Sequence, residues 1–382
     1  MIRLLNPLIR ILMLSTSEAI RSAACPELPL PFFQSTGASR SSVALDQWRG
    51  LALILVLISH GFFFTNRVNG IGRVGVNLFF FISGILVYRS LNKNKGSPSH
   101  LAVSFLWRRL RRLYPALIGY VLIMLPAVGP LGRLPNLPPG SDISTYLRAL
   151  PWGLLYTINY VHTYPMALGH LWSLACEMQF YTLAPLIFLF GKGNKLRAAV
   201  VYGSMSLILM GMGFIIPVRS GNYEWVRYHF EVAAWPMMLG FYCEFSKEWV
   251  RRFPRHLVKW VQALGIGTLV ISIIIMSFGI QTKLVVIAIG LGILPPCLVS
   301  YVFESPFPGR IGQLLAWMGV RTYSIYLWQQ PLTLCRFLPS IFHPVGAALS
   351  VIVGECSFRV FEKPFLADQK PGATQLTQTI GH

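Results

Sequence analysis

The sequence predicts an all-α protein, a polytopic bundle of transmembrane helices. Of its 382 residues, 54% are hydrophobic and only 12% are charged, and the mean hydropathy is +0.56. The apolar residues form long blocks and lack the one-sided spacing of a surface helix. This composition is typical of an integral membrane protein.

The lengths of the apolar blocks predict the individual crossings. A helix needs roughly 20 residues to cross the hydrocarbon core, and about ten blocks are that long. They are 49–66, 74–90, 113–132, 170–190, 196–217, 228–245, 257–278, 283–303, 320–338 and 341–361. A shorter stretch, 146–160, contains Arg148, Pro151 and Asn159. These residues favour one short re-entrant or interfacial segment over a further crossing.

The distribution of positive charge predicts the orientation. A net charge of +20 would favour a nucleic-acid partner in a soluble protein, but membrane proteins collect Lys and Arg in their cytoplasmic loops. If both termini are cytoplasmic and 146–160 does not cross, most of the 33 Lys and Arg residues face the cytoplasm. We therefore expect a multi-pass protein with both termini inside, membrane lipids around it and no nucleic-acid partner.

The chain is expected to contain one functional domain. Residues 45–365 form the predicted membrane domain, between a disordered cytoplasmic lead (1–44) and a disordered cytoplasmic tail (366–382). The six cysteines have no paired spacing and indicate neither a metal site nor a disulfide. Since polar groups are costly in hydrocarbon, the polar residues inside the apolar blocks are the functional candidates.

The segment LDQWRGLALILVLISH, residues 45–60, places three such groups on the first span. Asp46 is expected to cap the helix N-terminus. Arg49 is expected at the cytoplasmic interface, with His60 about 16 Å deeper. His60 is either a packed histidine bonded to a neighbouring carbonyl or a general base, because imidazole exchanges a proton near neutral pH.

The segment FLWRRLRRLYP, residues 105–115, gathers four arginines just before the third predicted span. They are either ordinary cytoplasmic anchors or a grip for phosphate groups, for which the planar guanidinium is well suited. Arg109 and Arg112 are three residues apart, so they share a helical face and are expected to act together with Arg49.

The segment GHLWSLACEMQFY, residues 169–181, carries Glu177 about two turns into the membrane. A carboxylate at that depth is paired or protonated, which indicates a function. The first span runs outward and this one inward. We therefore expect His60 and Glu177 at similar depths across one cavity, where Glu177 orients His60.

Two further segments have weaker signals. In GVNLFFFISG, residues 75–84, the small residues Gly75, Ser83 and Gly84 favour close helix packing. TYSIYLWQQP, residues 322–331, mixes hydroxyl, amide and aromatic groups at mid-membrane, as expected for the wall of a polar pocket.

In this order, and with the closing segment FRVFEKPF, these motifs resemble the acyltransferase 3 family of multi-pass membrane O-acyltransferases, from about Leu45 to Phe365. The resemblance implies transfer of an acyl group, often acetyl, from cytoplasmic acyl-CoA to a hydroxyl group. The acceptor would be a cell-envelope or secreted glycan or a lipid-linked saccharide, at the bacterial inner membrane. No tightly bound cofactor and no metal are implied.

The resemblance also implies residue roles. His60 matches the proposed catalytic histidine, Glu177 the glutamate of W-S-L-x-x-E, and Arg109 and Arg112 the R-x-x-R pair of the donor site, with Arg49 joining them. Substrate contacts are expected from Trp172, Ser173, Tyr326 and Gln329. Many members have histidine in Y-L-x-H-x-P where this chain has Gln329.

Two alternatives stay open at this point. The acceptor is a cytoplasmic small molecule, or the protein is a transporter in which intramembrane His and Glu relay protons or bind solute. No inverted repeat is evident in the sequence. Transfer of label from acetyl-CoA favours the enzyme, and uptake without acyl-CoA favours the transporter.

Overall fold

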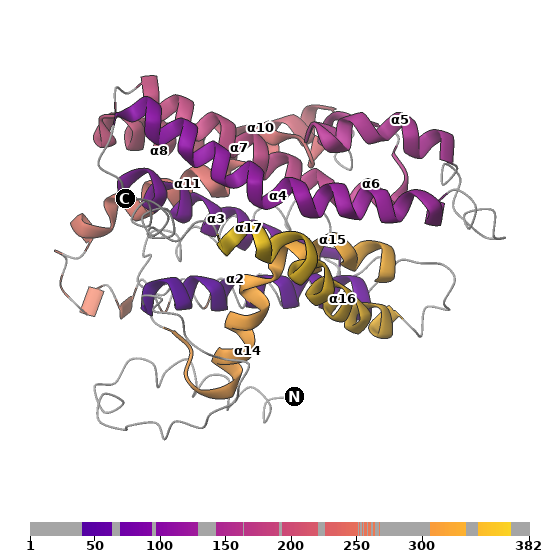
Figure 1. The fold of residues 1–382 in the computed structure, drawn as a ribbon. Helices are drawn as coiled ribbons and strands as arrows, with labels where there is room; N and C mark the ends of the chain where they lie inside the picture. Colours follow the sequence, from indigo (N-terminus) through magenta and orange to yellow (C-terminus); the bar gives the residue numbers. More distant parts are fainter. Residues whose placement is uncertain are drawn as a thin grey trace, which may run out of the picture.

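The computed structural model describes nine stretches of the chain and scattered residues between 252 and 267. The stretches are 40–62, 69–93, 97–128, 143–162, 164–190, 193–220, 226–250, 306–333 and 343–367. Throughout this described part, every regular element is a helix (Figure 1), which confirms the all-α class. The predicted span 283–303, most of 257–278, and most of the predicted lead and tail lie outside it.

The described helices belong to both halves of the chain. In chain order they are α2 (Arg40–Phe62), α3 (Asn69–Lys93), α4 (Pro98–Val128), α5 (Ile143–Leu154), the 3₁₀ helix η2 (Ile158–Tyr160), α6 (Met166–Gly169), α7 (Leu171–Phe190), α8 (Lys195–Ser220), α10 (Phe230–Ala233), α11 (Trp235–Val250), α14 (Gly309–Val320), α15 (Thr322–Thr333), α16 (His343–Ser357), the π-helix η5 (Phe358–Glu362) and α17 (Lys363–Ala367).

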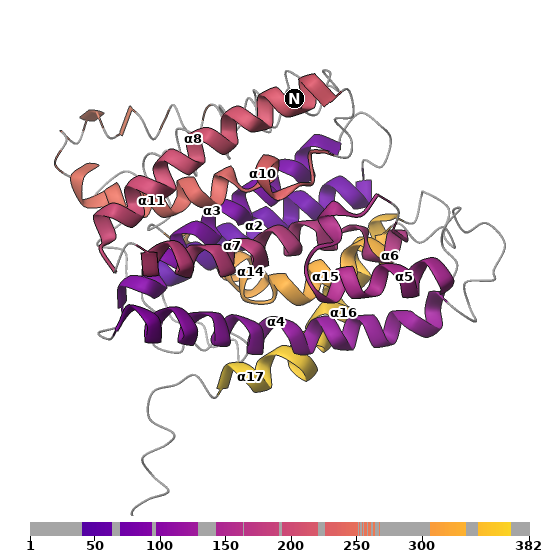
Figure 2. The same cartoon turned by 90° about the horizontal axis from the view of Figure 1, so that it is seen from above.

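The long helices form a bundle. Figure 2 shows α4, α7, α3 and α8 running in a common direction across the molecule. Helix α3 packs against both α2 and α11, and α11 also packs against α8. Helix α2 contacts α14, α4 contacts α7, and α15 contacts α16. Elements from both ends of the chain therefore meet around α2.

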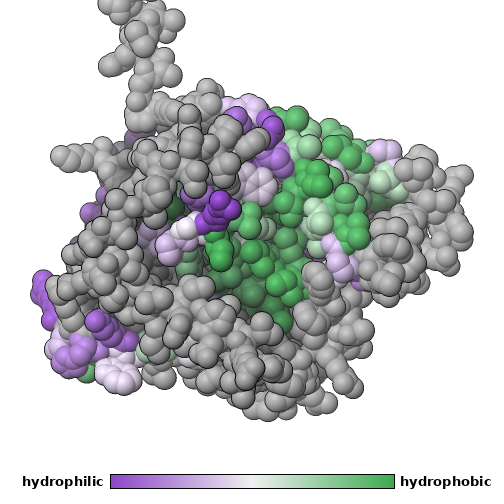
Figure 3. Space-filling model, turned by 90° about the horizontal axis from the view of Figure 1, so that it is seen from below, coloured by the Kyte–Doolittle hydropathy of each residue, from purple (hydrophilic) through white to green (hydrophobic). Residues whose placement is uncertain are grey.

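Four helices of the described part are long and apolar enough to cross a membrane. They are Ser42–Gly61, Ile71–Asn92, Pro98–Val128 and His343–Phe365. On one face of the molecule, a broad apolar area lies between hydrophilic regions (Figure 3), as expected where a surface meets lipid. These features support a multi-pass membrane protein, whereas the total of about ten crossings stays a prediction.

Two predicted helix starts are wrong. Helix α2 begins at Arg40, so Asp46 lies in its second turn and does not cap it. Helix α4 begins at Pro98, so the four arginines lie on the helix itself and not before it. Hydropathy finds the apolar part of a helix, but the backbone hydrogen bonds continue through polar turns at the interface.

The structure sets the limits of three predicted segments. The predicted span 320–338 starts at the junction of α14 and α15, where Arg321 leaves the helical conformation. The span 228–245 is divided between α10 and α11 at Ala234. The helix in 146–160 ends at Leu154, and its 12 residues give about 18 Å, which is too short to cross.

Glycines permit the closest helix contacts. A Cβ atom added at Gly84 on α3 would lie 2.0 Å from the Met237 carbonyl oxygen on α11, and one at Gly240 would lie 2.1 Å from the Phe81 oxygen. At Gly75, the distance to the Ala52 oxygen on α2 would be 2.5 Å. The predicted packing role of Gly75 and Gly84 is confirmed, because no larger residue fits without moving a helix.

We expect Gly84→Ala and Gly240→Ala to lower the thermal midpoint of the detergent-purified protein by several degrees, because each methyl group would overlap a carbonyl on the facing helix. The matched control is Gly211→Ala on α8, where a Cβ meets nothing within 4 Å. This control should keep or raise the midpoint, since Ala favours a helix over Gly by up to about 1 kcal/mol. Equal midpoints for all three variants would contradict the packing.

Candidate active site

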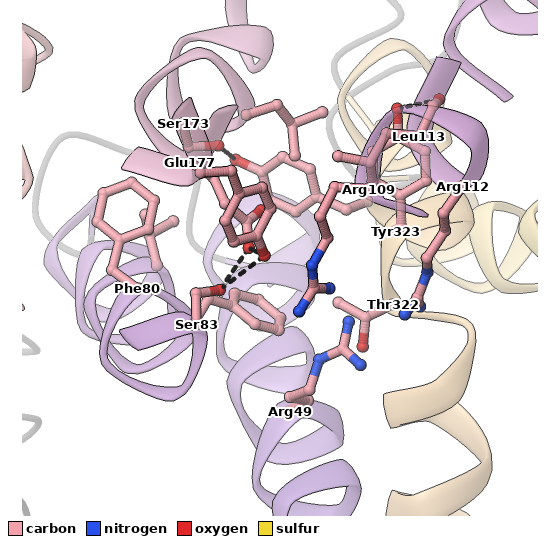
Figure 4. Close-up of a pocket in the computed structure, with 15 residues that line it drawn as sticks. Arg49, Phe80, Ser83, Arg109, Arg112, Leu113, Ser173, Glu177, Thr322 and Tyr323 are labelled. Carbon is pink, nitrogen blue, oxygen red and sulfur yellow. Dashed lines mark hydrogen bonds between the residues drawn. The ribbon is translucent and has the colours of Figure 1, made fainter. Parts of the chain in front are cut away.

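A polar pocket lies where five helices meet (Figure 4). Its polar lining comes from α2, α3, α4, α7 and α15, and apolar residues complete the wall. The polar residues are Arg49, Ser83, Arg109, Arg112, Ser173, Glu177, Tyr181, Thr322, Tyr323 and Tyr326, and the apolar ones are Val76, Phe79, Phe80, Leu113 and Leu174. Six of the nine predicted site residues therefore share one pocket.

Three arginines from two helices turn their guanidinium groups toward the same space (Figure 4). Arg49 on α2 is 3.5 Å from the Asp46 carboxylate one turn earlier. Arg109 on α4 lies over the Tyr181 ring, 4.7 Å from its centroid. No carboxylate in the described part of the chain forms an ion pair with Arg109. Three of the lining residues are arginines and one, Glu177, is a carboxylate, so the lining carries more positive than negative charge.

Arg112 is held by a carboxylate from the far end of the chain. Its Nε donates a hydrogen bond of 2.9 Å to Oε1 of Glu362, and Ser324 Oγ donates one of 2.9 Å to Oε2. Glu362 is fully buried and lies on the π-helix η5. Such insertions in helices often mark functional positions. Glu362 is absent from the predicted site, and the signal that could have found it is an acidic residue in the closing motif FRVFEKPF.

Glu177 belongs to the arginine end of the pocket. Tyr181 OH donates a hydrogen bond of 2.5 Å to its Oε1, and Ser83 Oγ donates another to the same atom. Ser83 therefore has a polar contact in addition to its small size. The Tyr181 ring lies beneath the Arg109 guanidinium, so Tyr181 contacts both Glu177 and Arg109.

The predicted common depth of His60 and Glu177 is wrong. Helices α2 and α3 run antiparallel, with Gly75 beside Ala52 and Gly72 beside Ser59. By this register Ser83, and with it Glu177, lies level with the start of α2, near Arg49. His60 is 11 residues further along α2, which is about 16 Å. Helix α7 was expected to run in the direction opposite to α2, with Glu177 at the level of His60. In the structure, Glu177 lies further along α7, beyond that level and near the arginines.

His60 is oriented by its own helix. Its Nδ1 lies 3.0 Å from the backbone carbonyl oxygen of Val56, and a carbonyl only accepts hydrogen bonds, so Nδ1 carries the hydrogen. In the neutral ring, Nε2 then holds the free electron pair. The Val56 carbonyl supplies the orientation that had been predicted for Glu177, and Nε2 has the form that a general base needs.

The four predicted substrate contacts separate into two groups. Ser173 and Tyr326 line the pocket, with their hydroxyl oxygens 2.7 Å apart. Trp172 and Gln329 do not line it. Trp172 packs edge-on against Phe80 and lies 5.1 Å from the Arg73 guanidinium, whereas Gln329 is fully buried on α15.

Nothing in the described part suggests a bound metal, because no three His, Cys, Asp or Glu residues gather there in a suitable group. The site comprises the arginine-lined pocket, with the His60 imidazole about 16 Å further along α2. The fold and the site are those of a helical membrane protein with a polar, arginine-lined pocket between its helices.

The chain belongs to the acyltransferase 3 family. The family model described as "Acyltransferase domain" matches residues 42–354, which confirms the resemblance. No solved structure matches the chain.

Two curated relatives bear names from cell-wall modification. The chain is 30% identical over 362 residues to "Peptidoglycan O-acetyltransferase OatA" of Listeria monocytogenes, covering 87% of this chain and 57% of that protein. It is 27% identical over 364 residues to "Putative peptidoglycan O-acetyltransferase YrhL" of Bacillus subtilis, covering 87% of this chain and 56% of that protein. The chain thus spans little more than half the length of these relatives.

We expect Glu362→Gln to destabilise the protein by about 3 kcal/mol, because it leaves the largely buried Arg112 without its counter-charge. The measurement is the thermal midpoint of the purified protein. Lys363→Gln, at the exposed neighbouring position, is the control and should behave as the wild type. If both variants have the thermal midpoint of the wild type, the ion pair between Arg112 and Glu362 contributes nothing to stability.

Proposed function

We propose that the protein is an acetyl-CoA-dependent O-acetyltransferase of the bacterial cytoplasmic membrane, with a hydroxyl of a cell-wall glycan as acceptor. Membership of an acyltransferase family and relatives named for peptidoglycan O-acetylation support this proposal. The observation that carries it is the convergence of Arg49, Arg109 and Arg112 on one pocket, since acyl-CoA is a polyanion.

The donor phosphates bind at the arginines. Phosphate oxygens accept charge-assisted hydrogen bonds from guanidinium groups, and paired contacts add geometric selectivity. Arg109 contributes most, because Arg112 already donates to Glu362 and Arg49 lies beside Asp46. Positive charge collects on the cytoplasmic side of membrane proteins, so this end of the pocket faces the compartment that supplies acyl-CoA, with both termini on the same side.

The distance between the arginines and His60 suits this donor. About 16 Å along α2 separates Arg49 from His60, and acyl-CoA likewise carries its thioester at the end of a long arm, far from its phosphates. Ser173 and Tyr326 lie on the way, on the neighbouring helices. With the phosphates held at one end, the thioester reaches the level of the imidazole.

The transfer is a direct attack on the thioester. His60 Nε2 takes the proton of the acceptor hydroxyl as its oxygen bonds to the acyl carbon. The C–S bond then breaks, and the imidazolium returns the proton to the departing CoA sulfur, which leaves as the thiol. The Val56 carbonyl keeps Nε2 available and supports the imidazolium through Nδ1–H.

The function is tested with the full chain in nanodiscs, given acetyl-CoA labelled in its acetyl group and a pentamer of N-acetylglucosamine as soluble acceptor. Transfer of label to the sugar supports the proposal. Absence of any transfer from acetyl-CoA, together with ion or solute flux in proteoliposomes, would replace it with the transporter.

Arg109→Gln is expected to raise the KM for acetyl-CoA about ten- to a hundredfold with a smaller effect on kcat, because a charged phosphate contact is lost. Its control, Arg108→Gln, removes a neighbouring charge that does not line the pocket. Similar KM values for both variants would exclude a specific donor contact by Arg109.

His60→Ala is expected to lower kcat by about 10² to 10⁴, the usual contribution of a positioned base. Affinity for acetyl-CoA, measured by equilibrium binding, should stay near the wild-type value because the arginines are untouched. Full activity in this variant would remove His60 from the mechanism.

A further inference from the structure

Three buried residues near the outer end of the bundle have polar atoms without hydrogen-bond partners. They are His170 through both ring nitrogens, Trp328 through Nε1, and Gln329 through both amide atoms, as judged within the described part of the chain. Their exposed fractions are 2%, 7% and 0%. The Leu327 backbone lies beside the His170 ring without forming a hydrogen bond of normal geometry.

The cluster lies in one place. The ring of Tyr120 packs edge-on against both His170 and Trp328, at centroid distances of 5.5 and 5.1 Å. His170 is also 5.8 Å from the Tyr326 ring and close enough to His60 to interact with it electrostatically. His170 and Trp328 therefore lie together around Tyr120, and His170 is the member of the cluster that His60 influences electrostatically.

Helix periodicity links this cluster to the arginine pocket. His170 has helical backbone angles and immediately precedes α7. It therefore lies on about the same face as Ser173 and Glu177 of α7, since three, four and seven residues complete whole turns. On α15, Gln329 is one turn beyond Tyr326. Each face lines the pocket at its inner end and continues outward to the level of His60. We call His60, His170 and Gln329 the outer tier.

The outer tier has the chemistry of a hydroxyl-binding site. A neutral imidazole has one donor and one acceptor, and an amide has two donors and an acceptor. Burying a polar group without a hydrogen-bond partner costs free energy, so a polar ligand that supplies these hydrogen bonds would be stabilised here. A sugar ring offers adjacent hydroxyl or acetamido groups, each with a donor and an acceptor, and matches both side chains.

We propose that His170 and Gln329 bind the acyl acceptor, an edge of a hydroxyl-rich sugar, and present one of its hydroxyl groups to His60. This inference rests on the proposed function and assigns its acceptor subsite. His170 accepts or donates a hydrogen bond at a substituent next to the reacting hydroxyl, and the Gln329 amide pairs with a second one. The arginine pocket takes no part in this contact, so the two substrates bind at opposite ends.

The decisive experiment measures both ligands separately on the full chain in nanodiscs. Acetyl-CoA and the pentamer of N-acetylglucosamine are titrated by calorimetry into the wild type, His170→Phe and Gln329→Met. Phe keeps the ring packing against Tyr120, and Met keeps most of the amide's volume. We expect each variant to raise the Kd of the sugar about tenfold, one hydrogen bond's worth, and to leave the Kd of acetyl-CoA unchanged.

Two further variants separate binding from folding. His170→Gln restores a donor and an acceptor and should recover part of the sugar affinity. Tyr202→Phe removes a buried hydroxyl that bonds to the Ala184 carbonyl at 2.5 Å, away from the outer tier, and should bind both ligands normally. In the transfer assay, the KM for the sugar should rise more than kcat falls.

Each result has one meaning for the subsite. An unchanged sugar Kd in His170→Phe and Gln329→Met, equal weakening of both ligands, or a wild type that does not bind the sugar overturns it. Failure of the proposed function is seen separately, when the wild type transfers no acetyl group from acetyl-CoA although the variants still differ in sugar binding.

Discussion

The structure depends on how positive charge is accommodated inside the bundle. Three guanidinium groups converge where α2, α4 and α7 meet, and charges taken out of water need partners. Glu362 supplies one from the far end of the chain, Asp46 supplies a looser one, and Tyr181 offers the face of its ring to Arg109. In the described part of the chain, Arg109 is therefore the arginine of this group without a carboxylate partner, which makes it the centre of the proposed donor site.

Close packing around the glycines keeps this arrangement rigid. Gly84 and Gly240 bring α3 against α11, and Gly75 brings α3 against α2. Because Ser83 on α3 donates a hydrogen bond to Glu177 on α7, a shift of α3 would break this hydrogen bond and change the pocket wall. The glycine contacts of α3 with α2 and α11 therefore help to set the geometry of the polar pocket.

The sequence predicts the helical class, the family and six residues of the pocket, because membrane hydropathy and ordered motifs are local signals. It does not predict correctly the depth of Glu177 in the bundle or the first residues of α2 and α4. Glu177 was placed level with His60 by counting from assumed membrane borders, and only the register of α2 on α3 brings it to Arg49. Glu362 was missed because its partners, Arg112 and Ser324, lie 250 and 38 residues away. No spacing rule connects such positions.

The π-helix at Phe358–Glu362 sets a condition on chain length. A π-turn contains one residue more than an α-helical turn. The residues that follow it, in α17, are therefore rotated about the helix axis relative to α16. Removing one residue from α16 would restore regular winding and turn the Glu362 carboxylate away from α4. The last helix therefore tolerates changes of side chain on its lipid face far better than a change in its number of residues.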